Sequence, residues 1–335
     1  NFFEKKFHQK TFMLASLGEL FDIPLPLYYT CSNNFPLKSF TKKVIPMNYK
    51  EMSCLAIHDI SGVGKCSLTV VLPVLSCCGV ETSVLPTAVL STHTGGFTGF
   101  TYRDLTGDIL PMARHWKSLG CRFQALYTGF LGSEAQIGLV EEMFEWFGGE
   151  DTLILVDPVM GDGGKLYQTY TPQMADGMAR LCRRADIVVP NMTEACHLLG
   201  RPYNPGPYTQ GEIEEILQGL CAMGPKMAVL TGVWLQEGAL GTACYDSQVG
   251  EAKLFLTDRI EGFYHGTGDL FASALLGGLL NGAPLEEACA LATEFTWRTI
   301  ETTFEKSPDH RFGPKFECHL PWLGEKMEEL RKNHP

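Results

Sequence analysis

The segment HGTGDLFASALLGG, from His265 to Gly278, places glycines, a threonine and one carboxylate at the start of an apolar helix. The first turn of a helix has unpaired N–H groups and the positive end of the helix dipole, so it attracts anions. Gly266, Thr267 and Gly268 leave the backbone open to a phosphate and can turn successive N–H groups toward it. The segment therefore predicts a helix start that can bind an anion.

Asp269 follows these residues in the predicted first turn. Its charge opposes a statically bound phosphate. The conflict disappears if Asp269 faces a hydroxyl and accepts its proton while a phosphoryl group is transferred. The alternative is an acid that stabilises the helix start, worth about 0.3 to 1 kcal/mol, and it leaves the glycines unexplained. We therefore favour Asp269 as a catalytic base.

Two further segments carry acids. VDPVMGDGGKLY places Asp157 and Asp162 in a glycine-rich loop after a buried run. Such carboxylates suit the Mg²⁺ ion that accompanies a nucleotide, although Asp157 also fits a turn cap before a proline. PNMTEA adds Asn191 and Glu194, whose spacing lets both reach one site and equally fits an N-cap with a capping-box glutamate. Both alternatives stay open.

The segment DISGVGKCS, from Asp59 to Ser67, resembles a phosphate loop only in part. Asp59 occupies the first glycine position and Cys66 the position of the magnesium-binding hydroxyl, so we reject that assignment. A tight strand-to-helix turn and a turn that contacts substrate both remain. In VLSTHTGGFTG, His93 and Thr94 could bond a small polar ring, although a single histidine in such a loop is more often structural.

Short aliphatic runs alternate with helical patterns from Ser53 onward, which predicts an open α/β sandwich with a mainly parallel sheet. Ligands bind at the carboxyl ends of such strands. Polar residues end each run there: Asp59, Thr128, Asp157, Asn191 and Thr231. The predicted strands are 54–60, 124–130, 152–159, 186–191 and 227–233. Helices are predicted at 133–147, 171–183, 211–223, 270–281 and 285–301, and an antiparallel hairpin precedes the opening segment.

Bulk composition narrows the class of protein. The chain has 335 residues, is 45% hydrophobic and carries a formal net charge of −11, which argues against nucleic acid as a partner. Its 12 cysteines lack zinc-site spacing, and we expect reduced thiols. With no long apolar run or cleavable signal pattern, we expect a cytoplasmic protein without a membrane partner. Residues 1–50 lack periodicity and predict a leader, an appendage or an expression remnant; residues 51–335 predict one domain.

Between Cys54 and Ile300 the motifs GVGK, STHTG, YTGF, DPVMGD, PNMTEA, LTG and GTGDLFASAL follow one another in this order. This combination resembles the ribokinase-like superfamily of small-molecule kinases, and specifically its vitamin B6 branch, the pyridoxal kinases. The resemblance implies a three-layer α/β/α sandwich, usually dimeric, with some members needing a monovalent cation such as K⁺. It implies ATP-dependent phosphorylation of the 5′-hydroxymethyl group of pyridoxal, pyridoxine or pyridoxamine.

The resemblance also assigns roles to residues of this chain. Asp269 corresponds to the catalytic base, and the three residues before it to the anion hole. Residues that organise ATP or Mg²⁺ are Asp157, Asp162, Asn191, Glu194 and Thr231, with the metal held by Asp157, Asp162 and Glu194, partly through water. The vitamin pocket is lined by Asp59, Val63, His93, Thr94 and Phe130.

Two positions depart from the B6 pattern. Many relatives have serine near the position of Asp59 and tyrosine at that of Phe130. An acid at 59 favours a protonated pyridine nitrogen or an amino-substituted ring. The sister branch that phosphorylates hydroxymethylpyrimidine often has such an aspartate, so that activity is the first alternative. A catalytically silent vitamin- or nucleotide-binding protein on the same fold is the second.

Overall fold

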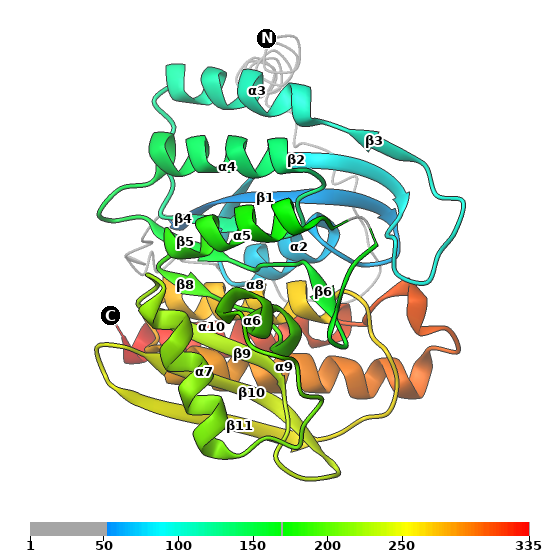
Figure 1. Cartoon of the computed structure of the whole chain (residues 1–335). Coiled ribbons are helices and arrows are strands. Elements are labelled where there is room, and N and C mark those ends of the chain that lie inside the picture. The colour runs from blue at the N-terminus through cyan, green and yellow to red at the C-terminus, as the bar shows by residue number, and fades with distance from the viewer. Residues whose placement is uncertain (1–51, 169, 335) are drawn as a thin grey trace, which may run out of the picture. The chain divides into compact units, whose positions relative to one another are not determined.

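The computed structural model describes residues 52–168 and 170–334 (Figure 1). Within these ranges a nine-stranded sheet has the order β11-β10-β9-β8-β5-β4-β1-β2-β3. The strands β2, β1, β4, β5, β8 and β9 run parallel, and the edges β3, β10 and β11 pair antiparallel with their neighbours. The carboxyl ends of the six parallel strands therefore share one edge, which is where ligands bind in sheets of this kind.

The strands have the following bounds: β1 Met52–Val63, β2 Val80–Thr92, β3 Tyr102–Asp104, β4 Ala125–Thr128, β5 Leu153–Val156, β8 Ile187–Val188, β9 Met227–Val233, β10 Ala239–Asp246 and β11 Glu251–Asp258. A separate two-stranded ribbon joins β6 Gly161–Asp162 to β7 Lys165–Leu166. The central strands are aliphatic and buried on both faces, as parallel strands between helical layers must be.

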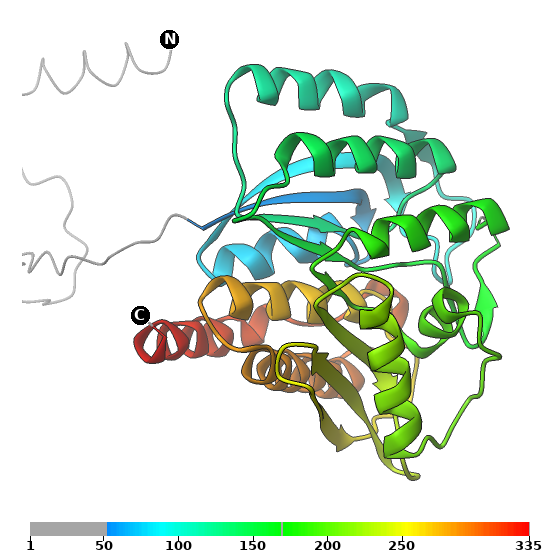
Figure 2. The ribbon, with the colours of Figure 1, turned by 60° about the vertical axis from the view of Figure 1, so that its left-hand side comes forward.

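Helices cover both faces of the sheet (Figures 1 and 2). One apolar core packs the sheet against α2 Leu68–Cys77, α8 Thr267–Leu280, α9 Leu285–Lys306 and α10 Leu320–Asn333. The other packs the opposite face against α3 Thr106–Ser118, α4 Glu134–Phe147, α5 Pro172–Arg183, α6 Met192–Leu199 and α7 Gln210–Ala222. The predicted three-layer α/β/α sandwich is confirmed.

Each predicted strand and helix and the predicted hairpin is present, although β8 covers only Ile187–Val188 of the predicted strand 186–191. Elements outside the prediction include β2, β3, α2, α3, α6 and α10. Two features of the β1–β2 pair bear on the site. First, β1 continues to Val63, so Asp59 lies inside this strand and not at its end; the register with β2 shifts beside it, between His58 and Ile60. Second, β2 forms a strand of 13 residues although it contains Pro86. On the β3 side the proline breaks no hydrogen bond, because β3 pairs with β2 only at residues 88–90, while on the other side Pro86 is in register with His58 of β1.

Two expectations from composition can be compared with the described residues. The cysteines in this part of the chain are all free thiols, as predicted. None of its helices has the length and hydropathy needed to cross a membrane. The expectation about residues 1–50 lies outside the described part of the chain.

Candidate active site

The glycine-rich segment forms the start of α8. Gly266 is the N-cap and has a left-handed backbone, with φ of 82°. A Cβ at Gly266 would lie 2.1 Å from the carbonyl oxygen of Lys65, so no other residue fits there. The close approach brings the β1–α2 turn against the helix start. The first-turn amides of α8 lack partners within the helix and remain available to an anion.

Asp269 is the buried acid of this turn, with 9% of its surface exposed. Its Oδ2 accepts a hydrogen bond from the Ser67 N–H at 2.8 Å, and the Cys66 Sγ lies 3.4 Å from the same oxygen. Burial raises the pKa of Asp269 to about 6, a shift to which Asp59 adds and which the Ser67 N–H opposes. The acid is thus a base of moderate strength, ionised at neutral pH.

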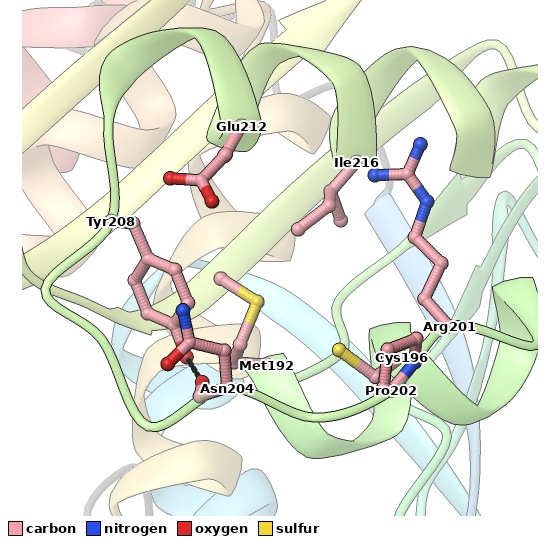
Figure 3. Close-up of a pocket in the computed structure, with 8 residues that line it drawn as sticks. All are labelled: Met192, Cys196, Arg201, Pro202, Asn204, Tyr208, Glu212 and Ile216. Atoms are coloured by element: carbon pink, nitrogen blue, oxygen red, sulfur yellow. Dashed lines mark hydrogen bonds between the residues drawn. The ribbon is translucent and has the colours of Figure 1, made fainter.

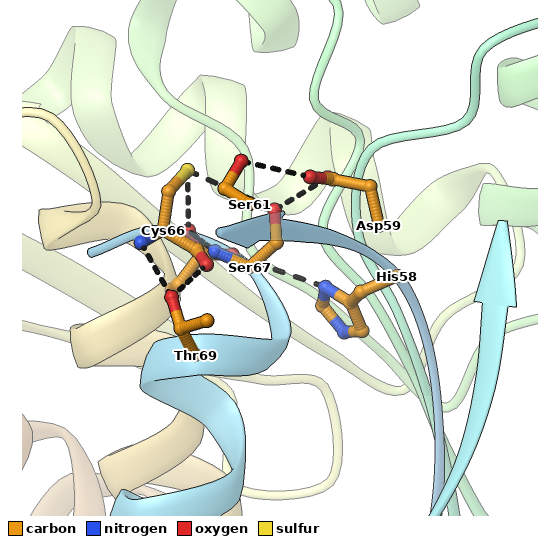
Figure 4. A network of polar contacts seen from close by, with 7 residues as sticks. His58, Asp59, Ser61, Cys66, Ser67 and Thr69 are labelled. Carbon is orange, nitrogen blue, oxygen red and sulfur yellow. Dashed lines mark hydrogen bonds and ion pairs between the residues drawn. The ribbon is translucent and has the colours of Figure 1, made fainter. Parts of the chain in front are cut away.

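Ser67 connects Asp269 to a second buried acid, Asp59, and Figure 4 shows the contacts between Ser67 and Asp59. The Ser67 Oγ donates to Oδ1 of Asp59 at 2.6 Å, and the Ser61 Oγ donates to Oδ2 at 3.2 Å. Burial raises the pKa of Asp59, and the two serine hydroxyls oppose the shift. Ser67 has φ of 51° and ψ of −132°, an unfavourable conformation for a residue with a side chain. This conformation directs its N–H and its Oγ to two different carboxylates.

Lys65 completes the GVGK motif, but its ammonium group is directed to the C-terminal part of the chain. The Nζ donates to the Pro314 carbonyl at 2.9 Å and to the Glu317 carboxylate at 2.7 Å. The Lys65 N–H also donates to the Phe312 carbonyl. These bonds agree with the rejection of a phosphate loop, because the lysine of such a loop must reach the phosphates.

Asp157 lies next to the start of α8. A Cβ placed on Gly268 would be 3.9 Å from the Asp157 Oδ2. Burial raises the pKa of Asp157 well above its usual range, and the charges of Glu194 and Asp269 raise it further. Several buried carboxylates that raise one another's pKa call for a compensating cation or proton. The position beside an anion-attracting helix start suits the cation that accompanies a nucleotide.

Asn191 and Glu194 form a capping box at the start of α6. The Asn191 Oδ1 accepts from the Glu194 N–H at 3.0 Å, while Glu194 Oε2 accepts from the Asn191 N–H at 2.8 Å. Glu194 Oε1 accepts from the Met160 N–H at 3.0 Å, and burial raises the pKa of Glu194 to about 8. Of the two alternatives, the helix cap is therefore present in the structure. The cap also keeps Glu194 close enough to Asp157 to affect its pKa.

The remaining predicted ligand of the metal is exposed to solvent, although its charge helps to raise the pKa of Glu194. Asp162 is exposed in β6, where its Oδ1 accepts from the Gly163 N–H at 2.7 Å. In the ranges that the structure describes, no group of three or more His, Cys, Asp or Glu side chains is close enough to hold a metal ion. Thr231 is half-buried on β9 and forms an isolated parallel bridge with Asn191.

The predicted residues of the vitamin pocket differ in their surroundings. His93 is buried and holds backbone: its Nδ1 accepts from the Gly95 N–H at 3.1 Å and its Nε2 is 2.7 Å from the Arg311 carbonyl. Thr94 is exposed and Phe130 half-buried, and Val63 is 51% exposed. Of these residues, Asp59 is linked to Asp269, because Ser67 donates one hydrogen bond to each of the two carboxylates.

The sequence assigns no role at the site to three residues near Asp269, and it names one of them, Cys66, only as a mismatch to a phosphate loop. Cys66 and Ser67 stand inside a motif that drew attention for its glycines, and their contacts with Asp269 span 203 and 202 residues. His58 has its Nδ1 3.9 Å from the Asp269 Oδ1. Its place directly before Asp59 was the only available signal, and a histidine in an aliphatic run is more often a core residue.

A cavity of about 310 Å³ lies between α6, α7 and the connection that joins them (Figure 3). The cavity is lined by Met192, Cys196, Arg201, Pro202, Asn204, Tyr208, Glu212 and Ile216. None of these is a predicted site residue. The acids around Asp269, and not this cavity, carry the arrangement of groups needed for proton and phosphoryl transfer.

The three-layer sandwich and the buried acid at the start of α8 define a small-molecule kinase of the ribokinase-like class. A family model described as phosphomethylpyrimidine kinase matches residues 75–314. The chain belongs to this family.

Solved structures and curated relatives agree with this assignment. A Bacteroides thetaiotaomicron protein assigned to the phosphomethylpyrimidine kinases, crystallised with pyridoxal, is 38% identical, with a TM-score of 0.78 over 82% of this chain and 96% of that chain. The pyridoxal kinase of Lactobacillus plantarum is 32% identical, with a TM-score of 0.76 over 83% and 98%. The pyridoxal kinase of Arabidopsis thaliana is 26% identical over 299 residues, covering 86% of this chain and 93% of its own.

Proposed function

We propose that this protein is an ATP-dependent kinase that phosphorylates the 5′-hydroxymethyl group of pyridoxal, pyridoxine and pyridoxamine. The observation that carries the proposal is the place of Asp269, a buried carboxylate at an anion-attracting helix start with a pKa of about 6. A carboxylate there can accept the proton of a primary alcohol next to the phosphoryl group that the alcohol receives. The names of the relatives supply the class of acceptor.

Different residues of the chain serve in proton transfer, in phosphate binding and in binding of the ring. Asp269 takes the proton of the alcohol, and the Ser67 N–H holds its Oδ2 in place. The amides of Thr267, Gly268 and Asp269 face the incoming phosphate, and Gly266 allows that turn to form. Asp59 is proposed to contact the ring or its amino substituent, with Val63, His93, Thr94 and Phe130 around it.

Two of the predicted ligands suit a magnesium ion that takes its other ligands from the ATP phosphates and water. Asp157 and Glu194 are buried oxygen ligands whose pKa values are raised, so a cation next to them would be stabilising. We propose Asp157 as the residue nearest the metal, with Asp162 and Glu194 acting through water and Asn191 and Thr231 near the nucleotide. When bound, Mg²⁺ neutralises charge on the phosphates. A monovalent cation such as K⁺, a homodimeric assembly and a cytoplasmic location are further parts of the proposal.

The experiment is an ADP-release assay with the three vitamers, hydroxymethylpyrimidine and a sugar as acceptors. We expect turnover with the vitamers and none with the sugar. Asp269→Asn should retain ATP binding but lose phosphoryl transfer by several orders of magnitude. Near wild-type turnover by this variant would contradict the assignment of the base, and tight vitamin binding without ADP release by the wild type would indicate a silent binding protein.

Hydroxymethylpyrimidine kinase activity is the second candidate. The family model carries a phosphomethylpyrimidine kinase description, and Asp59 is an acid where many B6 kinases have serine. The same assay decides between them: preferred turnover of hydroxymethylpyrimidine over all three vitamers would replace the first proposal.

A further inference from the structure

His58 is a fully buried histidine whose ring nitrogens both lack a hydrogen bond of normal geometry among the described residues, although the Tyr127 backbone is close enough to raise the pKa of the ring. Buried polar atoms in folded proteins almost always have a hydrogen-bond partner, so two ring nitrogens without one require an explanation. His58 lies on β1 directly before Asp59 (Figure 4), and its Nδ1 faces the carboxylate of Asp269 on α8. The unpaired groups are therefore located beside the proposed base.

The surroundings of His58 fit the imidazole ring closely. The ring meets the Tyr127 ring edge-on, with centroids 4.4 Å apart. A Cβ at position 129 would lie 2.4 Å from the His58 Nδ1, so Gly129 leaves the space that the ring occupies. The Nδ1 points to the Asp269 Oδ1 at 3.9 Å. The ring is thus held with one nitrogen directed at the carboxylate.

His58 is neutral at physiological pH, because burial lowers its pKa to about 3 even though the Tyr127 backbone opposes the shift and competes with Asp269 for the ring N–H. A neutral imidazole carries one N–H, on Nδ1 or on Nε2. An N–H on Nδ1 would face the Asp269 carboxylate as a donor, whereas a lone pair on Nδ1 would repel it. A movement of roughly 1 Å brings the two atoms to hydrogen-bond distance.

Asp269 is otherwise held at one oxygen. Its Oδ2 accepts from the Ser67 N–H, and His58 is the group that faces Oδ1. We propose that His58 is a positioning residue for Asp269: its Nδ1–H faces Oδ1 and, together with the Ser67 N–H, fixes the plane of the carboxylate. The catalytic part of this inference rests on the proposed kinase activity, while the tautomer of His58 does not.

The first test is the tautomer. In protein labelled with ¹⁵N-histidine at neutral pH, long-range ¹H–¹⁵N spectra distinguish the two neutral forms, and His58→Asn identifies the resonances of His58 by their loss. We expect the Nδ1–H form, with a change of the Nδ1 resonance in Asp269→Asn. The proposal is overturned if His58 is in the Nε2–H form, or if the Nδ1 resonance does not change in Asp269→Asn. This measurement needs neither substrate nor turnover.

The second test compares two variants, which should rank in one order by kcat and in the opposite order by thermal stability. Asn places an N–H close to the position of Nδ1, whereas Leu fills the volume without a donor. We expect His58→Leu to lower kcat about 10- to 100-fold at unchanged KM, and His58→Asn to stay within about threefold of wild type. Thermal stability should rank the other way, because an apolar side chain is better tolerated in a dry core.

Cys54→Ala is the matched control, since Cys54 is fully buried on the same strand and its loss should lower stability but leave kcat unchanged. If kcat follows stability in all three variants, His58 is a packing residue and the proposal is overturned. If the wild type phosphorylates no acceptor, the proposed function fails, and the tautomer alone decides the placement of His58. The tautomer also decides if either variant fails to fold.

Discussion

Ser67 donates its backbone N–H to the Asp269 Oδ2 at 2.8 Å and its hydroxyl to the Asp59 Oδ1 at 2.6 Å. One residue therefore joins the proposed base to the acid proposed to contact the ring. It does so from a backbone with φ of 51°, a conformation that costs about 1–3 kcal/mol for a residue with a side chain. Strain of this kind is retained where the surrounding contacts require the geometry.

Replacing Ser67 separates its two bonds. Ser67→Ala keeps the N–H and loses the hydroxyl, so we expect an increased KM for the vitamin and a kcat within a few fold of wild type. Ser67→Gly loses the same hydroxyl but relieves the backbone strain. Its free energy of unfolding should therefore exceed that of Ser67→Ala by at least about 1 kcal/mol. Steady-state kinetics and denaturant unfolding measure the two effects. Equal stability of the two variants would show that the backbone at Ser67 is not strained.

The pH dependence of turnover follows from the pKa of Asp269. The base acts in its charged form, and burial raises its pKa to about 6. As the pH falls through 6 the carboxylate is protonated, so kcat/KM should fall about tenfold per pH unit below this value and level off above it. The acidic side of the pH profile is measured from rates at constant ionic strength, and circular dichroism excludes acid unfolding. A limb near pH 4 would mean that Asp269 is solvated and not a buried base.

Much of this site was predictable because backbone geometry constrains sequence. Gly266 had to be glycine, and the order of strand-end acids follows from a parallel sheet with its ligands at one edge. Other features depend on tertiary distance. The spacing of Asn191 and Glu194 was compatible with a cap and with a ligand pair, and only the structure shows the cap. The contact of His58 with α8 joins residues 58 and 269, and no local pattern reports it.

Asp59 is predicted to set the choice among vitamers. A charged carboxylate favours a cationic ring or aminomethyl group, and a hydrogen bond to a charged group is worth about 1.5–3 kcal/mol. We therefore expect Asp59→Asn to lower kcat/KM for pyridoxamine at least about tenfold more than for pyridoxal. Ser61→Ala is the control, because it removes one donor to Asp59 without removing the charge. An equal loss for both vitamers would place Asp59 in the structure of the turn and outside recognition.

Gly266 and Gly268 are two residues apart, but replacing each with alanine is predicted to have a different effect: a loss of stability at Gly266 and a loss of activity at Gly268. A Cβ at Gly266 meets the Lys65 carbonyl at 2.1 Å and the left-handed backbone is unfavourable for alanine, so Gly266→Ala should lower the free energy of unfolding by about 1–3 kcal/mol or more. A Cβ at Gly268 meets only the Asp157 Oδ2, at an ordinary 3.9 Å. Gly268→Ala should therefore fold like wild type.

The added methyl group at Gly268 nevertheless stands where a phosphate would approach the first-turn amides. Loss of one such donor contact costs about 100- to 1000-fold in other oxyanion sites, and we expect a decrease of this order in kcat/KM for ATP. Thermal unfolding and ADP release on the same preparations separate the two effects. Full activity in Gly268→Ala would mean that the phosphate does not pass over the start of α8, which would remove the anion hole from the proposed mechanism.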